Sequence, residues 1–149
     1  MNIPDMGALE ILLVEDSDED AELTQRALKK RRIANNVHRV SDGAEALEFL
    51  FGTGRYAERG VHPPRVVLLD LKLPKVGGLE VLRAIRADTR TATTPVVVLT
   101  SSAEDRDLEE CYRAGANSYI VKPVDFDGFF QAVEQLGLYW AVLNRTPPP

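Results

Sequence analysis

The residues from position 65 to position 74 are Arg65-Val66-Val67-Leu68-Leu69-Asp70-Leu71-Lys72-Leu73-Pro74, an aliphatic run that ends in one carboxylate and continues into a loop with proline. Val and Leu without polar alternation predict a strand buried on both faces, as in a parallel sheet covered by helices. Ligands of such sheets bind at the carboxyl ends of the strands, where Asp70 falls. A single Asp in that position is more often a turn former. The role of Asp70 therefore depends on residues elsewhere in the chain.

The remaining chain alternates between strand-like and helix-like segments. The predicted strands cover 9–14, 37–40, 65–70, 96–99 and 117–121. The predicted helices cover 17–29, 44–51, 79–85, 103–114 and about 125–143. Residues 52–64 contain three glycines and two prolines and predict a surface loop without regular structure. Five strands separated by helices predict an α/β fold, a doubly wound flavodoxin-like parallel sheet with strand order 2-1-3-4-5.

The composition predicts one soluble globular domain. The chain has 149 residues, of which 44% are hydrophobic and 28% are charged. We expect a short lead over residues 1–8, a domain over 9–144 and a tail over 145–149. A net charge of -5 argues against nonspecific binding to nucleic acid or to an anionic membrane. The single cysteine, Cys111, and an opening without a basic and apolar leader predict a cytoplasmic protein, with no span through a membrane.

Polar side chains follow four of the predicted strands. Glu15 and Asp16 follow the first strand, and Asp70 ends the third. Thr100 follows the fourth strand and Lys122 follows the fifth. In the order 2-1-3-4-5, strands one and three flank the switch point of the sheet, so their three carboxylates should meet there. Three carboxylates without a neighbouring His or Cys suit a hard cation such as Mg²⁺.

This set of side chains suggests phosphoryl transfer. A carboxylate such as Asp70 can attack phosphorus and form an acyl phosphate, while a bound cation neutralises the incoming group. Lys122 can pair first with Asp70 and then with the phosphoryl oxygens, and Thr100 can donate its hydroxyl to the same oxygens.

These motifs resemble the receiver domains of two-component response regulators, and the resemblance extends from about Leu9 to Leu136. It rests on Glu15-Asp16, on Leu-Leu-Asp-Leu-Lys-Leu-Pro around Asp70, on Val-Leu-Thr-Ser around Thr100, and on Tyr-Ile-Val-Lys-Pro around Lys122. The resemblance implies a signalling protein, not an enzyme with an external substrate, that accepts a phosphoryl group from a histidine kinase. It also implies some catalysis of its own phosphotransfer and dephosphorylation.

The resemblance also implies roles for individual residues. The metal would be held by Asp16, by Asp70 and by the main-chain carbonyl of Lys72, with Glu15 acting through water. A cis peptide would join Lys122 to Pro123, which is plausible because proline lowers the cost of the cis form. Tyr119 has two alternatives, a core aromatic or a rotamer switch that swings inward when Thr100 moves toward the phosphoryl group.

Two features outside the site are similar to stand-alone regulators that partner bacterial phytochrome histidine kinases. These are the long 52–64 loop and the Leu-Gly-Leu-Tyr-Trp sequence at 136–140. We expect no output domain after the last helix, so the signal would pass to a phosphotransfer or target protein. The apolar residues Tyr139, Trp140 and Leu143 lie beyond the receiver core and predict a homodimer through the last helix. The alternative is a tail that folds back on its own domain.

Three other functions compete with this one. A Mg²⁺-dependent aspartyl-phosphate phosphohydrolase, similar to haloacid dehalogenases, would use the Asp-x-Asp pattern at Asp16-Ser17-Asp18, but it leaves Asp70 without a role. A chemotaxis-type single-domain regulator and a binding module with a degenerate site are the other two. We expect Asp18, Glu19 and Asp20 to be surface residues, because acids are favoured in any first helical turn.

Overall fold

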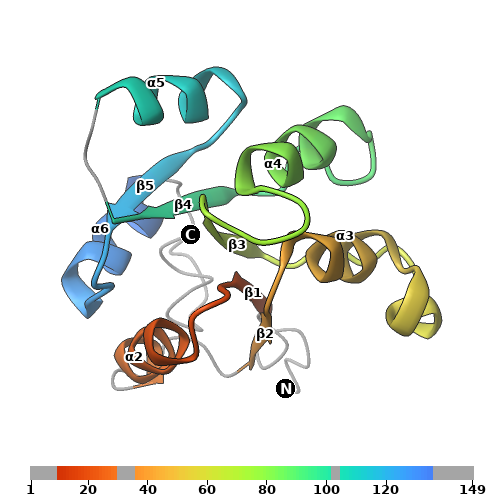
Figure 1. The fold of residues 1–149 in the computed structure, drawn as a ribbon, viewed down its shortest axis with the longest axis horizontal. Coiled ribbons are helices and arrows are strands. Elements are labelled where there is room, and N and C mark those ends of the chain that lie inside the picture. Colours follow the sequence, from red (N-terminus) through yellow and green to blue (C-terminus); the bar gives the residue numbers. More distant parts are fainter. Residues whose placement is uncertain (1–9, 30–35, 102–104, 136–149) are drawn as a thin grey trace, which may run out of the picture.

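Five short parallel strands form one sheet in the computed structural model, which describes residues 10–29, 36–101 and 105–135. The strands are β1 (Glu10–Val14), β2 (Asn36–Val40), β3 (Val66–Asp70), β4 (Val96–Thr100) and β5 (Ser118–Val121). Their order in the sheet is β2-β1-β3-β4-β5 (Figure 1). This order confirms the predicted doubly wound fold and places the ends of β1 and β3 side by side.

Helices cover both faces of the sheet. They are α2 (Asp18–Lys29), α3 (Gly43–Phe51), α4 (Gly78–Ala87), α5 (Asp105–Arg113) and α6 (Phe126–Gln135). Helices α2 and α6 lie on one face, and α3, α4 and α5 lie on the other (Figure 1). Among the described residues, no helix has both the length and the apolar character that crossing a membrane requires.

The two faces explain why the strands lack polar alternation. Successive side chains of a strand point to opposite faces. Leu68 therefore packs in the layer that includes Phe129 of α6, and Leu69 packs in the layer that includes Phe49 of α3. All five residues of β3 are buried, as are all five of β4. Both central strands need apolar side chains at every position except where the site begins.

The prediction that residues 52–64 lack regular structure was wrong. Gly54–Arg59 forms a 3₁₀ helix, η1, directly after α3. Tyr56 packs edge-to-face on Phe49, with ring centroids 5.2 Å apart, and the guanidinium of Arg59 lies 3.9 Å from the centre of the same ring. Arg59 also pairs with Glu10 of β1. These anchors come from α3 and β1, so the local sequence of the loop gives no sign of them.

Side chains cap the first turns of α2 and α3. The hydroxyl of Ser17 accepts a hydrogen bond from the main-chain N–H of Asp20 (3.2 Å) and caps α2. The carboxylate of Asp42 accepts one from the N–H of Glu45 (2.8 Å) and caps α3. The last helix was predicted to continue to position 143, and it is described as far as Gln135. Residues 136–149, with Tyr139, Trp140 and Leu143, lie outside the described part of the chain, as does the predicted lead.

Candidate functional site

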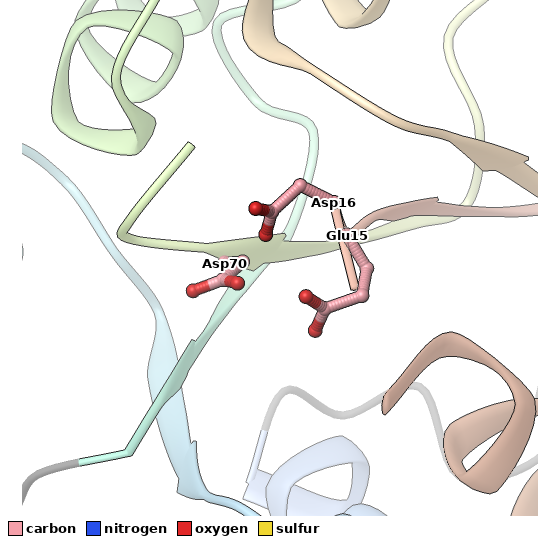
Figure 2. A group of neighbouring side chains, drawn as sticks. All are labelled: Glu15, Asp16 and Asp70. Carbon is pink, nitrogen blue, oxygen red and sulfur yellow. The ribbon is translucent and has the colours of Figure 1, made fainter. Parts of the chain in front are cut away.

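Three carboxylates meet at the carboxyl ends of β1 and β3. One oxygen from each of Glu15, Asp16 and Asp70 lies within 4.8 Å of the others. The register pairs Val14 with Leu69, so the residues that follow them are also neighbours. Figure 2 shows the three side chains gathered around one space at the strand ends. Glu15 and Asp70 are buried, whereas Asp16 is exposed to solvent.

The ammonium group of Lys122 enters this cluster from the end of β5. Its Nζ lies 2.6 Å from Oε1 of Glu15 and 3.0 Å from Oδ2 of Asp70. The main-chain N–H of Lys122 donates to the carbonyl of Thr100 (2.8 Å), which continues the pairing of β5 with β4. The Lys122–Pro123 peptide is cis, the geometry that the family resemblance implies.

Burial changes the proton affinities of the site. Burial raises the pKa of the Glu15 carboxyl to about 7, Lys122 opposes this rise, and Asp70 adds to it. Burial alone would lower the pKa of Lys122, but its contacts with Glu15 and Asp70 raise that pKa above the usual range. The ammonium group is therefore a fixed positive charge among the carboxyl groups.

The donor set fits a hard divalent cation. Its side-chain ligands are carboxylate oxygens, and the carboxyl groups of Glu15, Asp16 and Asp70 outnumber the single ammonium group beside them. Mg²⁺ and similar ions prefer oxygen ligands and retain several waters. The exposed position of Asp16 leaves room for those waters.

The loop after β3 closes against Asp70. The N–H of Lys72 donates to Oδ1 of Asp70 (3.1 Å), and the N–H of Gly78 donates to the carbonyl of Leu71 (3.1 Å). A Cβ at Gly78 would lie only 2.3 Å from the carbonyl oxygen of Asp70, so this close approach requires glycine. The main chain of Lys72 is thereby held beside the carboxylate of Asp70.

Thr100 and Tyr119 lie on β4 and β5. Thr100 is buried at the end of β4, one residue beyond Leu99, which is the register partner of Asp70. Tyr119 is 37% exposed, and its ring packs edge-to-face on Tyr112 with centroids 6.3 Å apart. Of the two alternatives for Tyr119, the core aromatic is therefore wrong.

One residue that contacts the site was not predicted from the sequence. Asp20 was assigned to the surface, but its Oδ2 lies 3.1 Å from Nζ of Lys122. Asp18 and Glu19 are exposed, as expected. The signal for Asp20 was its place in the first turn of a helix that starts immediately beyond Asp16, since this turn lies against the strand ends. In a run of similar acids, the sequence does not indicate which one faces the site.

The sequence profile of the response regulator receiver domain matches residues 11–134. The chain belongs to this family. Receivers are signalling proteins that take phosphoryl groups from histidine kinases, and this receiver has the same phosphoacceptor function. The alternative of an aspartyl-phosphate hydrolase gives Asp70 no role. Membership in the receiver family explains why an acid ends β3, so the hydrolase alternative has lost its support.

Two relatives match this receiver over most of their length. It is 43% identical over 140 residues to the probable methanogenesis regulatory protein FilR2 of Methanothrix harundinacea, covering 93% of this chain and 88% of FilR2. It is 37% identical over 137 residues to the response regulator Rcp1 of Synechocystis sp., covering 92% of each.

Solved structures agree with these matches. The bacteriophytochrome response regulator AtBRR is 51% identical, with a TM-score of 0.81, over 88% of this receiver and 94% of that chain. The Mn²⁺-bound form of Rcp1 is 36% identical, with a TM-score of 0.73, over 94% of this receiver and 98% of that chain. Thus a similar protein holds a divalent cation.

Proposed function

We propose that Asp70 is the residue that accepts the phosphoryl group, in a reaction that uses Mg²⁺. The observation that carries the proposal is the position of Asp70, which is 5% exposed, accepts a hydrogen bond from Lys122 and lies next to two further acids. A buried carboxylate with a fixed cation beside it can attack phosphorus and then share the new negative charge with that cation.

The transfer forms one bond and breaks one. An oxygen of Asp70 attacks phosphorus, the bond from phosphorus to the histidine nitrogen of the kinase breaks, and the imidazole leaves with the electron pair. Lys122 stays beside Asp70 and donates N–H groups to the phosphoryl oxygens, to which Thr100 donates its hydroxyl. Mg²⁺, held by Asp16, Asp70 and the carbonyl of Lys72, with Glu15 acting through water, would supply positive charge to the same oxygens.

The acyl phosphate returns to the resting carboxylate by hydrolysis. Water attacks phosphorus, the bond from phosphorus to the Asp70 oxygen breaks, and inorganic phosphate leaves. We propose that this receiver assists both its own phosphotransfer and this dephosphorylation. While the phosphoryl group is present, Thr100 moves toward it and Tyr119 swings inward from its exposed position, which changes the surface that partners contact.

Acetyl phosphate with Mg²⁺ tests the proposal without a kinase. We expect a mass increase of one phosphoryl group, and borohydride reduction of the acyl phosphate should locate it at Asp70. Asp70→Asn should remain unlabelled, and Asp16→Asn should need at least about tenfold more Mg²⁺ for half-maximal labelling. Glu19→Gln removes an exposed acid from the same run and serves as the control. Undiminished labelling of Asp70→Asn would refute the assignment.

The kinase that we propose as phosphoryl donor is a bacterial phytochrome. The support is the similarity to AtBRR, which is a bacteriophytochrome response regulator. Phosphotransfer from a purified phytochrome kinase should depend on whether the photoreceptor has been converted by red or by far-red light. A transfer rate that is the same under both, or that is matched by an unrelated kinase, would contradict this pairing. The reaction would take place in the cytoplasm, and a phosphotransfer or target protein would receive the signal.

We also propose a domain that extends from residue 9 to residue 144, and a homodimer through Tyr139, Trp140 and Leu143. Both domain limits and the three interface residues lie outside the described part of the chain. Light scattering of the full chain and of a chain ending at Leu136 tests the dimer. The shorter chain should be a monomer, and an unchanged mass would eliminate the last helix as the interface.

A further inference from the structure

Asp20 is a fourth acid that contacts the site from a different element. It lies in the first turn of α2, where its main-chain N–H is fixed by the hydroxyl of Ser17 (3.2 Å). Its carboxylate contacts Nζ of Lys122 at 3.1 Å. The acids beside it behave differently, because Asp18 pairs with Arg39 (2.7 Å) and Glu19 is exposed. One member of the acidic run is thus directed at the lysine of the site.

Three carboxylates surround the ammonium group of Lys122. An ammonium group has three N–H donors. The contacts of Nζ are Glu15 at 2.6 Å, Asp70 at 3.0 Å and Asp20 at 3.1 Å. Nζ donates hydrogen bonds to Oδ2 of Asp70 and to Oδ2 of Asp20, so a phosphoryl oxygen that approaches the ammonium group competes with these carboxylates for its N–H donors.

Asp20 is the carboxylate that can be displaced at the lowest cost. The side chain of Glu15 is fully buried, so water cannot replace its contact with Lys122. The side chain of Asp20 is 42% exposed, so water can solvate it after the ion pair opens. Asp70 itself carries the phosphoryl group and stays next to Lys122.

We propose that Asp20 is a positioning residue that holds Lys122 in the resting site and competes with the phosphoryl group for it. The inference rests on the proposed role of Asp70. The ion pair stabilises the unphosphorylated state, and the released carboxylate then repels a group that carries about -1.5 to -2 charges. Both effects lower the equilibrium level of phosphorylation, so Asp20 biases this receiver toward its resting state.

Beryllofluoride, which binds an aspartate as a noncovalent mimic of a phosphoryl group, measures this equilibrium in the full chain with saturating Mg²⁺. Asp20→Asn should bind it about two- to fivefold more tightly than the wild type, the range expected for a partly exposed ion pair. Asp20→Glu keeps the charge and should return the affinity toward the wild-type value. Glu19→Gln loses the same charge one residue away, without contact to Lys122, and should match the wild type.

A structural defect at the helix start would weaken binding, so tighter binding distinguishes competition from damage. Equal or weaker binding by Asp20→Asn would overturn the inference, and so would an equal gain in Glu19→Gln, which would indicate a general effect of charge. A raised Mg²⁺ requirement in Asp20→Asn would overturn it too, by making Asp20 a metal ligand. Failure of the proposed function has another signature, because beryllofluoride would then bind equally to the wild type and to Asp70→Asn.

Discussion

The ammonium nitrogen of Lys122 lies 3.0 Å from Oδ2 of Asp70, although β4 separates their two strands in the sheet. This ion pair holds a cation at the position where a phosphoryl group would need it. The contact also makes the stability of the resting site depend on charge balance, because Lys122 is 16% exposed and Glu15 is fully buried.

Replacing Lys122 by Met should destabilise the protein most strongly when no divalent cation is present. The free energy of unfolding should fall by about 3 kcal/mol, because Glu15 and Asp70 lose the cation that compensates their buried charge. Mg²⁺ should restore part of this loss. Urea unfolding with Mg²⁺ and with chelator measures the difference. Lys75→Met, at a side chain that is 67% exposed, is the control. If Mg²⁺ left the loss of unfolding free energy unchanged, this result would contradict the idea that Lys122 and the cation compensate the same carboxylates.

Gly78→Ala should damage the site, whereas Gly77→Ala should not. A Cβ at Gly78 would overlap the carbonyl oxygen of Asp70, but a Cβ at Gly77 would have no heavy atom within 4 Å. We expect Gly78→Ala to cost about 1–3 kcal/mol of stability and to slow labelling by acetyl phosphate. Gly77→Ala should stay within about 1 kcal/mol of the wild type. Urea unfolding and the labelling rate test both variants, and equal behaviour of the two would refute the steric argument.

Arg86→Ala should reduce stability without changing the chemistry of the site. Its guanidinium donates to the carbonyls of Gly115 (3.0 Å), Thr94 (2.6 Å) and Ala92 (3.0 Å). These carbonyls precede the amino ends of β4 and β5, whereas Asp70 lies at the carboxyl end of β3. Losing these charge-assisted hydrogen bonds should cost about 2–4 kcal/mol.

Arg83 is exposed and lies on α4, the helix that also contains Arg86, so Arg83→Ala is the matched control. For Arg86→Ala, the Mg²⁺ concentration that gives half-maximal labelling of the folded protein should equal that of the wild type. A changed Mg²⁺ requirement would show that contacts at the amino ends of the strands affect the site at their carboxyl ends.

The contribution of Tyr56 to stability should disappear at high pH. Its hydroxyl donates to Glu45 (2.7 Å) and contacts Nε2 of His38 (3.0 Å). Burial and the hydrogen bond to Glu45 raise the pKa of Tyr56 to about 12. The folded state therefore favours the neutral phenol, whose pKa in an unfolded chain is about 10. This stabilisation is complete below about pH 10 and is lost as the pH rises through about 12.

Tyr56→Phe measures this effect directly. Near neutral pH the variant should be less stable than the wild type by about 1 kcal/mol, because Glu45 and His38 lose a partner. The difference should narrow above about pH 10 as the wild type alone loses the contribution. Urea unfolding at several pH values compares the two proteins. A difference that stays constant over the alkaline range would remove Tyr56 as the titrating group.

The parallel sheet and the grouping of acids with Lys122 at the strand ends follow from the amino-acid sequence. Uniformly apolar runs at β3 and β4 identify buried strands, and helical segments between strands require parallel pairing. Parallel pairing then brings the carboxyl ends of the strands to one edge. Asp70, Thr100 and Lys122 could therefore be grouped before any contact was known, since each directly follows or ends a recognisable strand.

Which individual side chains meet depends on contacts between elements that are distant in the sequence. Lys122 contacts Asp20 across 102 positions of the chain, and nothing in the acidic run distinguishes Asp20 from Glu19. The same limit hid η1, which Tyr56 and Arg59 anchor to Phe49 of another element. Periodicity reports which face of an element is buried, but not which residue of a distant element packs against it. Such contacts depend on how the elements pack, and that packing is fixed only when the whole chain folds.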